Sequence, residues 1–277
     1  MPKVHFVWDI HYRCNFRCPY CWFDKNWEQM ETHNRNLSLT DMIAVWKRIY
    51  DRHDECHIAI TGGEPSIYPY FIDLIEELSK MHTIKVTSQL SGDYYTFARR
   101  INPERVNLDM NFHPLEAKIE PFIRKVLALK NKGFRGGVCY LAYPPQMDKI
   151  DFYRQEFEKH GIGFALAAFW GEWQGKNYPA AYTAEEKKMM APYLGDVDRM
   201  NYHLEGRKTK GKLCRSGQLY ASIKADGTVT RCGPLSHKPI GNLFDDNFKL
   251  FDTPMPCEAE ICPCDEYVWI VDEDRAK

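Results

Sequence analysis

The sequence predicts an α/β fold built around a parallel sheet, followed by a smaller module that contains a hairpin. Between residue 3 and about residue 170, short β-like runs alternate with longer runs of helical periodicity, which is the pattern of repeated βα units. From about residue 208 the pattern changes to short strands, two of which flank an Asp226-Gly227 turn. We therefore expect a first domain over residues 1–182 and a connecting helix plus second module over residues 183–277.

The expected sheet has six strands, each a short run rich in apolar and β-branched residues. Their ranges are 3–10, 57–61, 84–89, 106–111, 137–143 and 162–169. Because helices separate them, consecutive strands should run parallel. The spacing alone allows either a barrel-like sheet or a doubly wound sheet.

The helices between these strands show apolar residues at intervals of three and four. The first has such a face and begins next to Ser38 or Thr40, either of which can cap its first turn. The expected helices are 39–51, 69–82, about 94–101, 115–132 and 148–160. A Gly- and Trp-rich loop over 170–182 and a helix from 183 to about 205 lead to the hairpin strands 219–224 and 228–231.

Composition argues against several classes of protein, among them nucleic-acid-binding, membrane-spanning and secreted proteins. The chain has 277 residues, 44% of them hydrophobic, and a formal net charge of −1, which argues against a nucleic-acid partner bound through bulk charge. No apolar run approaches the ~18 residues of a membrane span, and the first nine residues lack the features of a signal peptide. Ten cysteines in such a chain suggest metal ligation in a reducing compartment rather than disulfides, so we expect a cytoplasmic enzyme.

Three of these cysteines, Cys14, Cys18 and Cys21, are spaced C-x3-C-x2-C directly after the first expected strand. Three thiolates can hold three irons of a cubane iron–sulfur cluster and leave the fourth iron open, whereas an ordinary electron-transfer cluster takes four cysteines. Two alternatives remain: a zinc site with His11 as the fourth ligand, and a disulfide with one spare thiol.

This spacing, with Tyr20 before the last cysteine, resembles the motif of the radical S-adenosylmethionine (radical SAM) superfamily. The resemblance implies a partial (βα)6 barrel. It also implies that S-adenosylmethionine (SAM) binds the open iron of a 4Fe–4S cluster, which cleaves it to a 5′-deoxyadenosyl radical.

A second motif, Gly62-Gly63-Glu64-Pro65, directly follows the second expected strand. The carboxyl ends of parallel strands meet at one mouth, so this segment should lie beside the cysteine loop. Glycines let a backbone edge approach a ligand closely, and Glu64 supplies a carboxylate that can pair with an ammonium. The segment is similar to the Gly-Gly-Glu-Pro motif of the same family, which implies contact with the methionine amine of SAM.

Other contacts to SAM are expected from polar residues in the next two strands. Thr87, Ser88 and Gln89 end the third strand and Asn107 lies in the fourth, where the family carries residues that reach the ribose or carboxylate of SAM. The chain departs from the family by having Ser88-Gln89-Leu90 in place of Thr-Asn-Gly. His113, after the fourth strand, either faces a substrate or is a hydrogen-bonded loop residue.

A second group of cysteines lies near the carboxyl end. The spacing Cys214-x12-Gly227-x4-Cys232 is similar to the C-x9-15-G-x4-C pattern that opens the SPASM/twitch extensions of radical SAM enzymes, and the hairpin turn should return Cys232 toward Cys214. Three further cysteines follow: Cys257, Cys262 and Cys264.

Five cysteines resemble the shorter twitch form, which implies one auxiliary 4Fe–4S cluster. We expect its ligands to be Cys214, Cys232, Cys262 and either Cys257 or Cys264. Structural zinc held by four thiolates is the alternative.

The two remaining cysteines, Cys56 and Cys139, stand alone in the sequence, as buried packing residues often do. Cys139 lies in the fifth strand, whose side chains alternate between the two faces of the sheet. If it faces the cavity, its thiol could donate a hydrogen atom to a substrate radical.

The resemblance implies an oxidoreductase of the twitch class, which we expect to dehydrogenate a small polar substrate such as a sugar, nucleotide sugar or cyclitol. The first cysteine at position 14 leaves no room before it for a peptide-recognition domain. The aromatic and charged loop 170–178 suits a polyol, and it would also suit a peptide. A flavodoxin- or ferredoxin-type reductant is expected as partner. The alternatives are an epimerase, an enzyme that modifies a ribosomal peptide, and a non-catalytic electron carrier with two clusters.

Overall fold

A curved nine-stranded sheet organises the chain in the computed structural model, which describes residues 3–21, 26–194, 204–262 and 270–271. The strand order is β13-β12-β11-β1-β2-β3-β4-β5-β6. Its first six strands in the chain are β1 (His5–His11), β2 (His57–Gly62), β3 (Thr83–Ser88), β4 (Val106–Phe112), β5 (Val138–Ala142) and β6 (Phe164–Ala168). All five pairs among these six strands are parallel, which confirms the predicted α/β fold.

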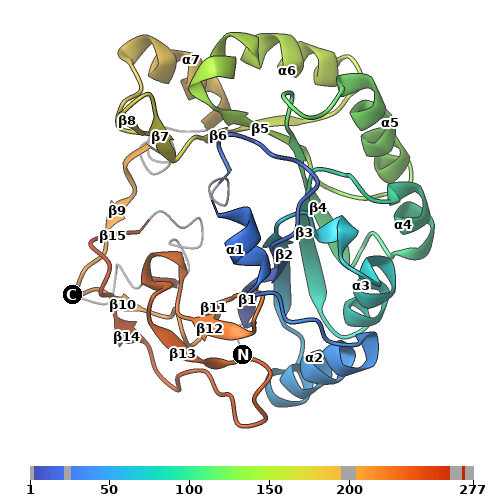
Figure 1. Ribbon diagram of the computed structural model, residues 1–277, viewed down its shortest axis with the longest axis vertical. Helices are drawn as coiled ribbons and strands as arrows, with labels where there is room; N and C mark the ends of the chain where they lie inside the picture. Colours follow the sequence, from blue (N-terminus) through green and yellow to red (C-terminus); the bar gives the residue numbers. More distant parts are fainter. Residues whose placement is uncertain (1–2, 22–25, 195–203, 263–269, 272–277) are drawn as a thin grey trace.

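The helices between these strands line the outer, convex side of the sheet (Figure 1). They are α2 (Leu39–His53), α3 (Phe71–Ser79), α4 (Tyr94–Arg100), α5 (Ile119–Lys130) and α6 (Ile150–Glu158). A short helix α1 (Trp27–Glu31) follows the cysteine loop, and the 3-10 turns η1 (Pro65–Ile67) and η2 (Pro144–Lys149) follow β2 and β5. Helix α3 begins later than predicted because Tyr70 adopts a left-handed conformation (φ 63°) that cannot continue a helix.

The core lies between the sheet and these helices. Alternate strand residues point outward, and the α2 residue Trp46 packs against two of them, Phe6 and Trp8, with ring centroids 5.7 and 5.3 Å away. All three side chains are fully buried. The opposite residues of each strand face the concave side, where many are polar, so only the mouth and the inner face of the sheet are available for chemistry.

The carboxyl-terminal part extends the same sheet. A hairpin of β11 (Tyr220–Ile223) and β12 (Thr228–Thr230) forms around Asp226-Gly227 as predicted, and Gly227 has the positive φ of 84° that the turn requires. Strand β11 pairs in parallel with β1, so the hairpin is continuous with the barrel sheet across the expected domain boundary at 182. This pairing covers the edge that β1 would otherwise expose.

Smaller elements complete the fold. Residues 170–182, predicted as a loop, contain the hairpin β7 (Gly171–Trp173) and β8 (Lys176–Tyr178). Helix α7 (Ala184–Leu194) confirms the first half of the predicted helix 183–205, whose continuation at 195–203 lies outside the described residues. The remaining short strands are β9 (Arg207–Lys208), β10 (Leu213–Cys214), β13 (Pro239–Asn242), β14 (Met255–Pro256) and β15 (Ile261–Cys262).

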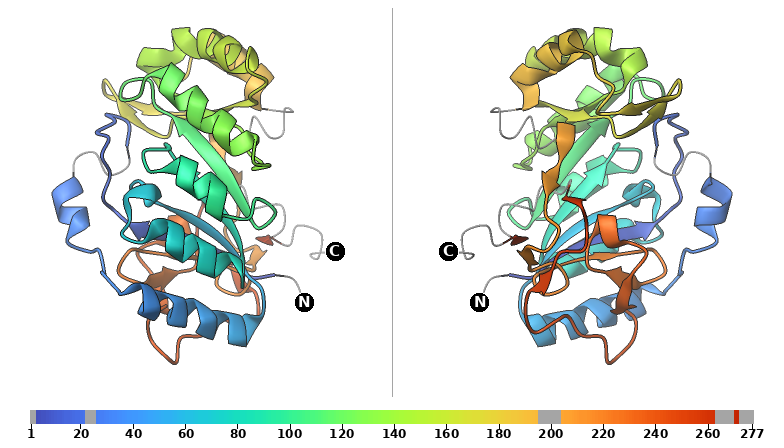
Figure 2. Two further views of the ribbon diagram at one scale, coloured as in Figure 1. Left: turned by 90° about the vertical axis from the view of Figure 1, so that its right-hand side faces the viewer. Right: turned by 90° about the vertical axis from the view of Figure 1, so that its left-hand side faces the viewer.

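Strand β13 is an edge strand of the main sheet. The other four, β9, β10, β14 and β15, lie on the open side of the curved sheet, away from helices α3 to α5 (Figures 1 and 2). None of the helices in the described ranges combines the length and the apolarity that a membrane crossing needs.

Candidate functional site

A cavity of about 250 Å³ opens at the carboxyl ends of the parallel strands. It is lined by the cysteine loop after β1, by Gly62, Gly63 and Glu64 after β2, and by residues at the ends of β3 to β6. The mouth predicted from the order of elements therefore exists. Pro65 does not line the cavity, since it begins η1 behind Glu64.

The three cysteines of the amino-terminal triplet all line this cavity. Burial raises the pKa of Cys14, and it raises the pKa of Cys18 to about 12. Such thiols stay protonated at neutral pH until a metal displaces the proton, because ligation requires the thiolate. The donor set therefore fits an iron–sulfur cluster, whose assembly would release these protons.

The Gly62-Gly63 pair lies directly against the backbone that leads into the cysteine loop. The amide of Gly63 donates to His11 O and the amide of Glu64 donates to Arg13 O, each at 2.8 Å. A Cβ on Gly63 would come within 1.9 Å of Arg13 O, and one on Gly62 within 2.3 Å of His11 O. Their missing side chains therefore make room for the backbone of residues 11–13. Both glycines also line the cavity, so the approach of a ligand stays a prediction.

Glu64 is 1% exposed, and its carboxylate ties the end of β2 to the end of β3. Its Oε1 accepts from Ser88 Oγ at 2.6 Å and from the amide and hydroxyl of Ser66, while Oε2 accepts from the Gln89 amide at 2.9 Å. Burial raises the pKa of Glu64, and these donors oppose that shift because they stabilise the carboxylate. Glu64 therefore has a structural role in joining β2 to β3. The predicted contact with an ammonium would come in addition to it.

His11 is a buried structural histidine. Its Nδ1 accepts from the Arg13 amide at 3.1 Å, so in the neutral ring the proton is on Nε2. Nε2 then donates to Glu64 O at 3.0 Å. Burial lowers the pKa of His11 to about 4. Both ring nitrogens are therefore engaged with backbone, which argues against the alternative of His11 as a zinc ligand.

Of the residues in the third and fourth strands that were predicted to bind SAM, some line the cavity and one does not. Thr87, Ser88 and Gln89 line the cavity, and Gln89 Nε2 lies 3.6 Å from Cys14 Sγ. Asn107 does not line it, because it lies near the start of β4 and is exposed. Asn111, which the sequence analysis missed, occupies the same face of β4 at its carboxyl end and lines the cavity instead. Its position near the carboxyl end of the expected strand 106–111 could have identified it.

An aromatic group lies around His113 at the cavity. The Tyr20 hydroxyl and His113 Nδ1 are hydrogen-bonded at 3.0 Å, and Tyr20 packs on Tyr143 with ring centroids 4.9 Å apart. Burial lowers the pKa of His113 to about 4, so it is neutral at physiological pH. His113 is thus the hydrogen-bonded loop residue of the second alternative. It also lines the cavity, and contact with a substrate stays a prediction.

The two isolated cysteines have different positions. Cys139 faces the concave side of β5, next to Asn111 in the strand register, and lines the cavity. Cys56 is fully buried in the main core, and burial raises its pKa to about 12. Cys56 is therefore a packing residue, and Cys139 lies where chemistry can occur.

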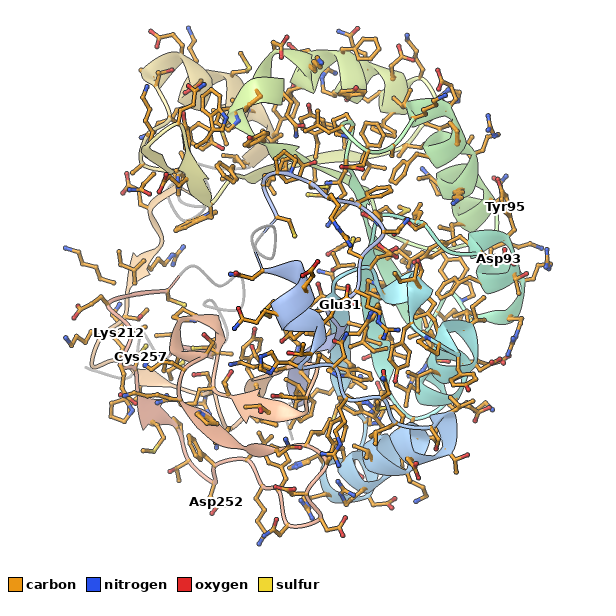
Figure 3. The ribbon with its side chains drawn as sticks, viewed as in Figure 1. Glu31, Asp93, Tyr95, Lys212, Asp252 and Cys257 are labelled. Carbon is orange, nitrogen blue, oxygen red and sulfur yellow. The ribbon has the colours of Figure 1, made fainter. Side chains whose placement is uncertain are left out.

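Four cysteines of the carboxyl-terminal group share one buried cluster, apart from the main core: Cys214, Cys232, Cys257 and Cys262. Burial raises the pKa of Cys214, and raises that of Cys232 to about 11; the charges of the other three thiolates add to the rise for Cys232. The Cys257 amide donates to Lys212 O at 2.8 Å, which places these two labelled residues side by side (Figure 3). Cys264, the other candidate ligand, lies outside the described residues.

Within the described residues, no group of three or more His, Cys, Asp or Glu side chains converges closely enough to bind a single metal ion. A four-iron cubane takes one thiolate per iron, so its ligands need not converge on one point. Both cysteine groups have the donor chemistry for such a cluster.

Comparisons with known proteins concern the first half of the chain and the overall fold. The family model of the radical SAM superfamily matches residues 8–145. Molybdenum cofactor biosynthesis protein 1 of Homo sapiens is 33% identical over 79 residues, which are 27% of this chain and 12% of that protein. GTP 3′,8-cyclase of Pectobacterium atrosepticum is 31% identical over 81 residues, which are 29% of this chain and 24% of that enzyme. The chain thus spans about a quarter or less of the length of these curated relatives.

Solved structures with a similar fold cover most of the chain. Native anSMEcpe with bound AdoMet has a TM-score of 0.62 at 13% identity and covers 88% of this chain and 78% of its own. Streptococcus suis SuiB has a TM-score of 0.63 at 12% identity and covers 88% of this chain and 64% of its own. At such low identity the likeness concerns the fold alone.

The contact between Gly63 and the cysteine loop yields a first prediction. Gly63→Ala should lower the free energy of unfolding by at least about 3 kcal/mol, because the new methyl overlaps a fixed carbonyl oxygen. Chemical denaturation measures this loss. Gly163→Ala is the matched control, because Gly163 is exposed and has open space around it; its loss should not exceed about 0.5 kcal/mol. Equal stability of the two variants would contradict the contact.

The buried His11 predicts a dependence of stability on pH in the metal-free chain. The folded chain protonates His11 near pH 4 and the unfolded chain near 6.5, so acid favours unfolding between these values. This group alone should remove about 2 kcal/mol of stability between pH 7.5 and pH 5. His11→Gln should lose about that much less on acidification, measured by denaturation at both pH values. The control His33→Gln changes an exposed histidine and should keep the wild-type loss.

Proposed function

Because this chain belongs to the radical SAM superfamily, we propose that it cleaves SAM reductively to a 5′-deoxyadenosyl radical and dehydrogenates a small polar substrate. The observation that carries the proposal is one cavity lined by Cys14, Cys18, Cys21, Glu64 and Asn111. A triplet of thiolates, a buried carboxylate and polar strand ends share the position where parallel α/β folds bind ligands.

The cysteine triplet would hold a 4Fe–4S cluster, which supplies the electron that breaks a carbon–sulfur bond of SAM. Around it, Glu64 Oε2 accepts one hydrogen bond, from the Gln89 amide, and a carboxylate oxygen can accept more. The remaining capacity of Oε2 supports a contact between Glu64 and the ammonium of SAM, while Oε1 remains hydrogen-bonded to Ser66 and Ser88. Thr87 and Asn111 supply further polar contacts at the same cavity.

The concave face of the sheet supports a polar substrate. Thr61, Thr87 and Asn111 line the cavity at their strand ends. Deeper in the barrel, Lys85 Nζ and Asp109 form an ion pair at 2.6 Å. A sugar, nucleotide sugar or cyclitol would find both donors and acceptors on this face.

Dehydrogenation needs an exit for one electron. The substrate would lose a hydrogen atom to the deoxyadenosyl radical, and the resulting radical would then lose a proton and an electron. We propose that an auxiliary 4Fe–4S cluster on Cys214, Cys232, Cys262 and either Cys257 or Cys264 takes up that electron. The shared burial of the described four cysteines supports this site, and a flavodoxin- or ferredoxin-type protein would supply the reducing electron at the triplet.

A peptide substrate is the alternative that the fold neighbours favour. SuiB bound to its precursor peptide SuiA has a TM-score of 0.58 to this chain at 13% identity, and anSMEcpe is seen with the Cp18Cys peptide at a TM-score of 0.61. The short match to GTP 3′,8-cyclase makes a purine nucleotide a further substrate to test.

Epimerisation is a second candidate reaction, and the position of Cys139 favours it. Its side chain lines the same cavity as the cysteine triplet, where a thiol could return a hydrogen atom to a substrate radical. Cys139 would then be a catalytic residue, and the auxiliary site would not be needed to take up an electron.

The proposal predicts iron content and SAM cleavage together. Anaerobically reconstituted protein should carry about eight irons and eight sulfides, and after reduction it should convert SAM to 5′-deoxyadenosine. The Cys14→Ala/Cys18→Ala/Cys21→Ala variant should keep about four irons and form no 5′-deoxyadenosine. Eight irons without SAM cleavage by the wild type would indicate an electron carrier instead. Zinc without iron would refute both the radical SAM enzyme and the electron carrier.

Solvent deuterium separates the two reactions once a substrate is known. For dehydrogenation, Cys139→Ala should turn over at a rate near that of the wild type in deuterated water, and the wild-type product should carry no deuterium at the reacting carbon. Mass spectrometry and NMR of the product measure this. Deuterium at that carbon in the wild-type product, absent with Cys139→Ala, would establish epimerisation. Cys56→Ala controls for loss of a buried thiol elsewhere.

A further inference from the structure

A buried cation lies within the carboxyl-terminal cysteine group. The side chain of Arg231 is 7% exposed. It donates through Nε to Ser216 O and through its two Nη atoms to Pro256 O and Met255 O, each at 3.1 Å. Guanidinium groups stay charged in proteins. These carbonyls accept three of its five N–H groups but carry no formal charge, so they do not neutralise it.

The carboxylate nearest to this charge among the described contacts gives little compensation. Glu258 Oε1 lies 4.0 Å from Arg231 Nη1, its side chain is 49% exposed, and it also pairs with Lys238. An exposed pair at this distance is weak because water screens it. A buried charge is costly unless it is paired, so the position of Arg231 calls for a nearby anion.

The three contacts of Arg231 connect segments that carry cysteines. Ser216 lies two residues after Cys214, Arg231 itself precedes Cys232, and Pro256 precedes Cys257. One guanidinium thus holds three of these segments together. This arrangement would place the positive charge of Arg231 beside the proposed auxiliary cluster.

Ser216 adds hydrogen bonds to one of the sulfurs. Its hydroxyl oxygen lies 3.2 Å from Cys214 Sγ and its amide nitrogen 3.5 Å, and the residue is 2% exposed. A sulfur that ligates iron carries no proton, so the Ser216 hydroxyl must then be the donor. Hydrogen bonds to sulfur, nearby charge and low exposure to solvent are the features that set the reduction potential of an iron–sulfur cluster.

We propose that Arg231 and Ser216 tune the auxiliary site to accept an electron, by stabilising the more negative, reduced form of its cluster. A cubane held by thiolates is an anion, and one added electron increases its negative charge. A buried guanidinium and a hydroxyl donor interact more strongly with that added charge than they would in water. Both are positioning residues, and the inference rests on the proposed auxiliary cluster.

The experiment is a redox titration of that cluster alone. The Cys14→Ala/Cys18→Ala/Cys21→Ala background removes the other cluster, and electron paramagnetic resonance follows reduction at controlled potentials. Arg231→Gln keeps hydrogen-bonding capacity but removes the charge, and should lower the equilibrium constant for one-electron reduction at least tenfold, which is about 59 mV. Ser216→Ala should lower it about threefold or more through the lost donor.

Two control variants change similar groups that do not touch the cysteines. Lys238→Gln removes an exposed positive charge and Ser236→Ala removes an exposed serine four residues after Cys232. Both should stay within twofold of the parent protein. A clear fall confined to Arg231→Gln and Ser216→Ala would support the tuning role.

Iron content separates failure of this inference from failure of the proposed function. If the background variant binds no iron, the auxiliary cluster itself is refuted. If it carries about four irons and both test variants titrate within twofold of it, the tuning role is overturned while the cluster stands. If Arg231→Gln fails to assemble a cluster, the titration of Ser216→Ala alone tests the tuning role: a fall of about threefold or more supports it, and a value within twofold of the background variant overturns it.

Discussion

The contact between the Gly62-Gly63 turn and the segment 11–13 is the constraint on which the mouth of this barrel depends. It joins the ends of β1 and β2 by two backbone hydrogen bonds, with no side chain between them. Glu64 continues from this turn and binds the end of β3 through Ser88 and Gln89. The cysteine loop is therefore held by the rigid sheet, which suits a site that must keep three thiols in place.

Burial has the same consequence in both cysteine groups. It raises the pKa of Cys14 and Cys18 at the mouth and of Cys214 and Cys232 in the carboxyl-terminal group. Binding of a proposed cluster would have to remove protons that the folded protein holds tightly, so its assembly would be favoured by higher pH. Nearby donors, Gln89 at the mouth and Ser216 in the second group, partly offset this by stabilising thiolates.

The sheet connects the two groups. Strand β1 leads into the first cysteine loop, and its parallel partner β11 leads through the hairpin to Cys232. Val7 of β1 also packs against the buried cluster that contains the carboxyl-terminal cysteines. The two cysteine groups are therefore joined through one pair of adjacent strands.

The sequence by itself determined the alternation of strands and helices, the parallel sheet, the hairpin at Asp226-Gly227 and the meeting of the cysteine loop with the Gly62-Gly63-Glu64 segment. These follow from local periodicity and from the order of elements, which nearby residues encode. Position along the fourth strand also contained the information that Asn111 rather than Asn107 reaches the mouth, because a side chain near the start of β4 cannot reach the far end of the strand.

Only the tertiary structure decided features that depend on residues far apart in the chain. It engaged both nitrogens of His11 with backbone, turned Cys139 toward the cavity, and placed the charge of Arg231 among segments that carry Cys214, Cys232 and Cys257. It also paired β11 with β1, which no local pattern specifies. Each of these depends on packing between distant segments, where burial and the available partners, rather than residue type, decide what a side chain does.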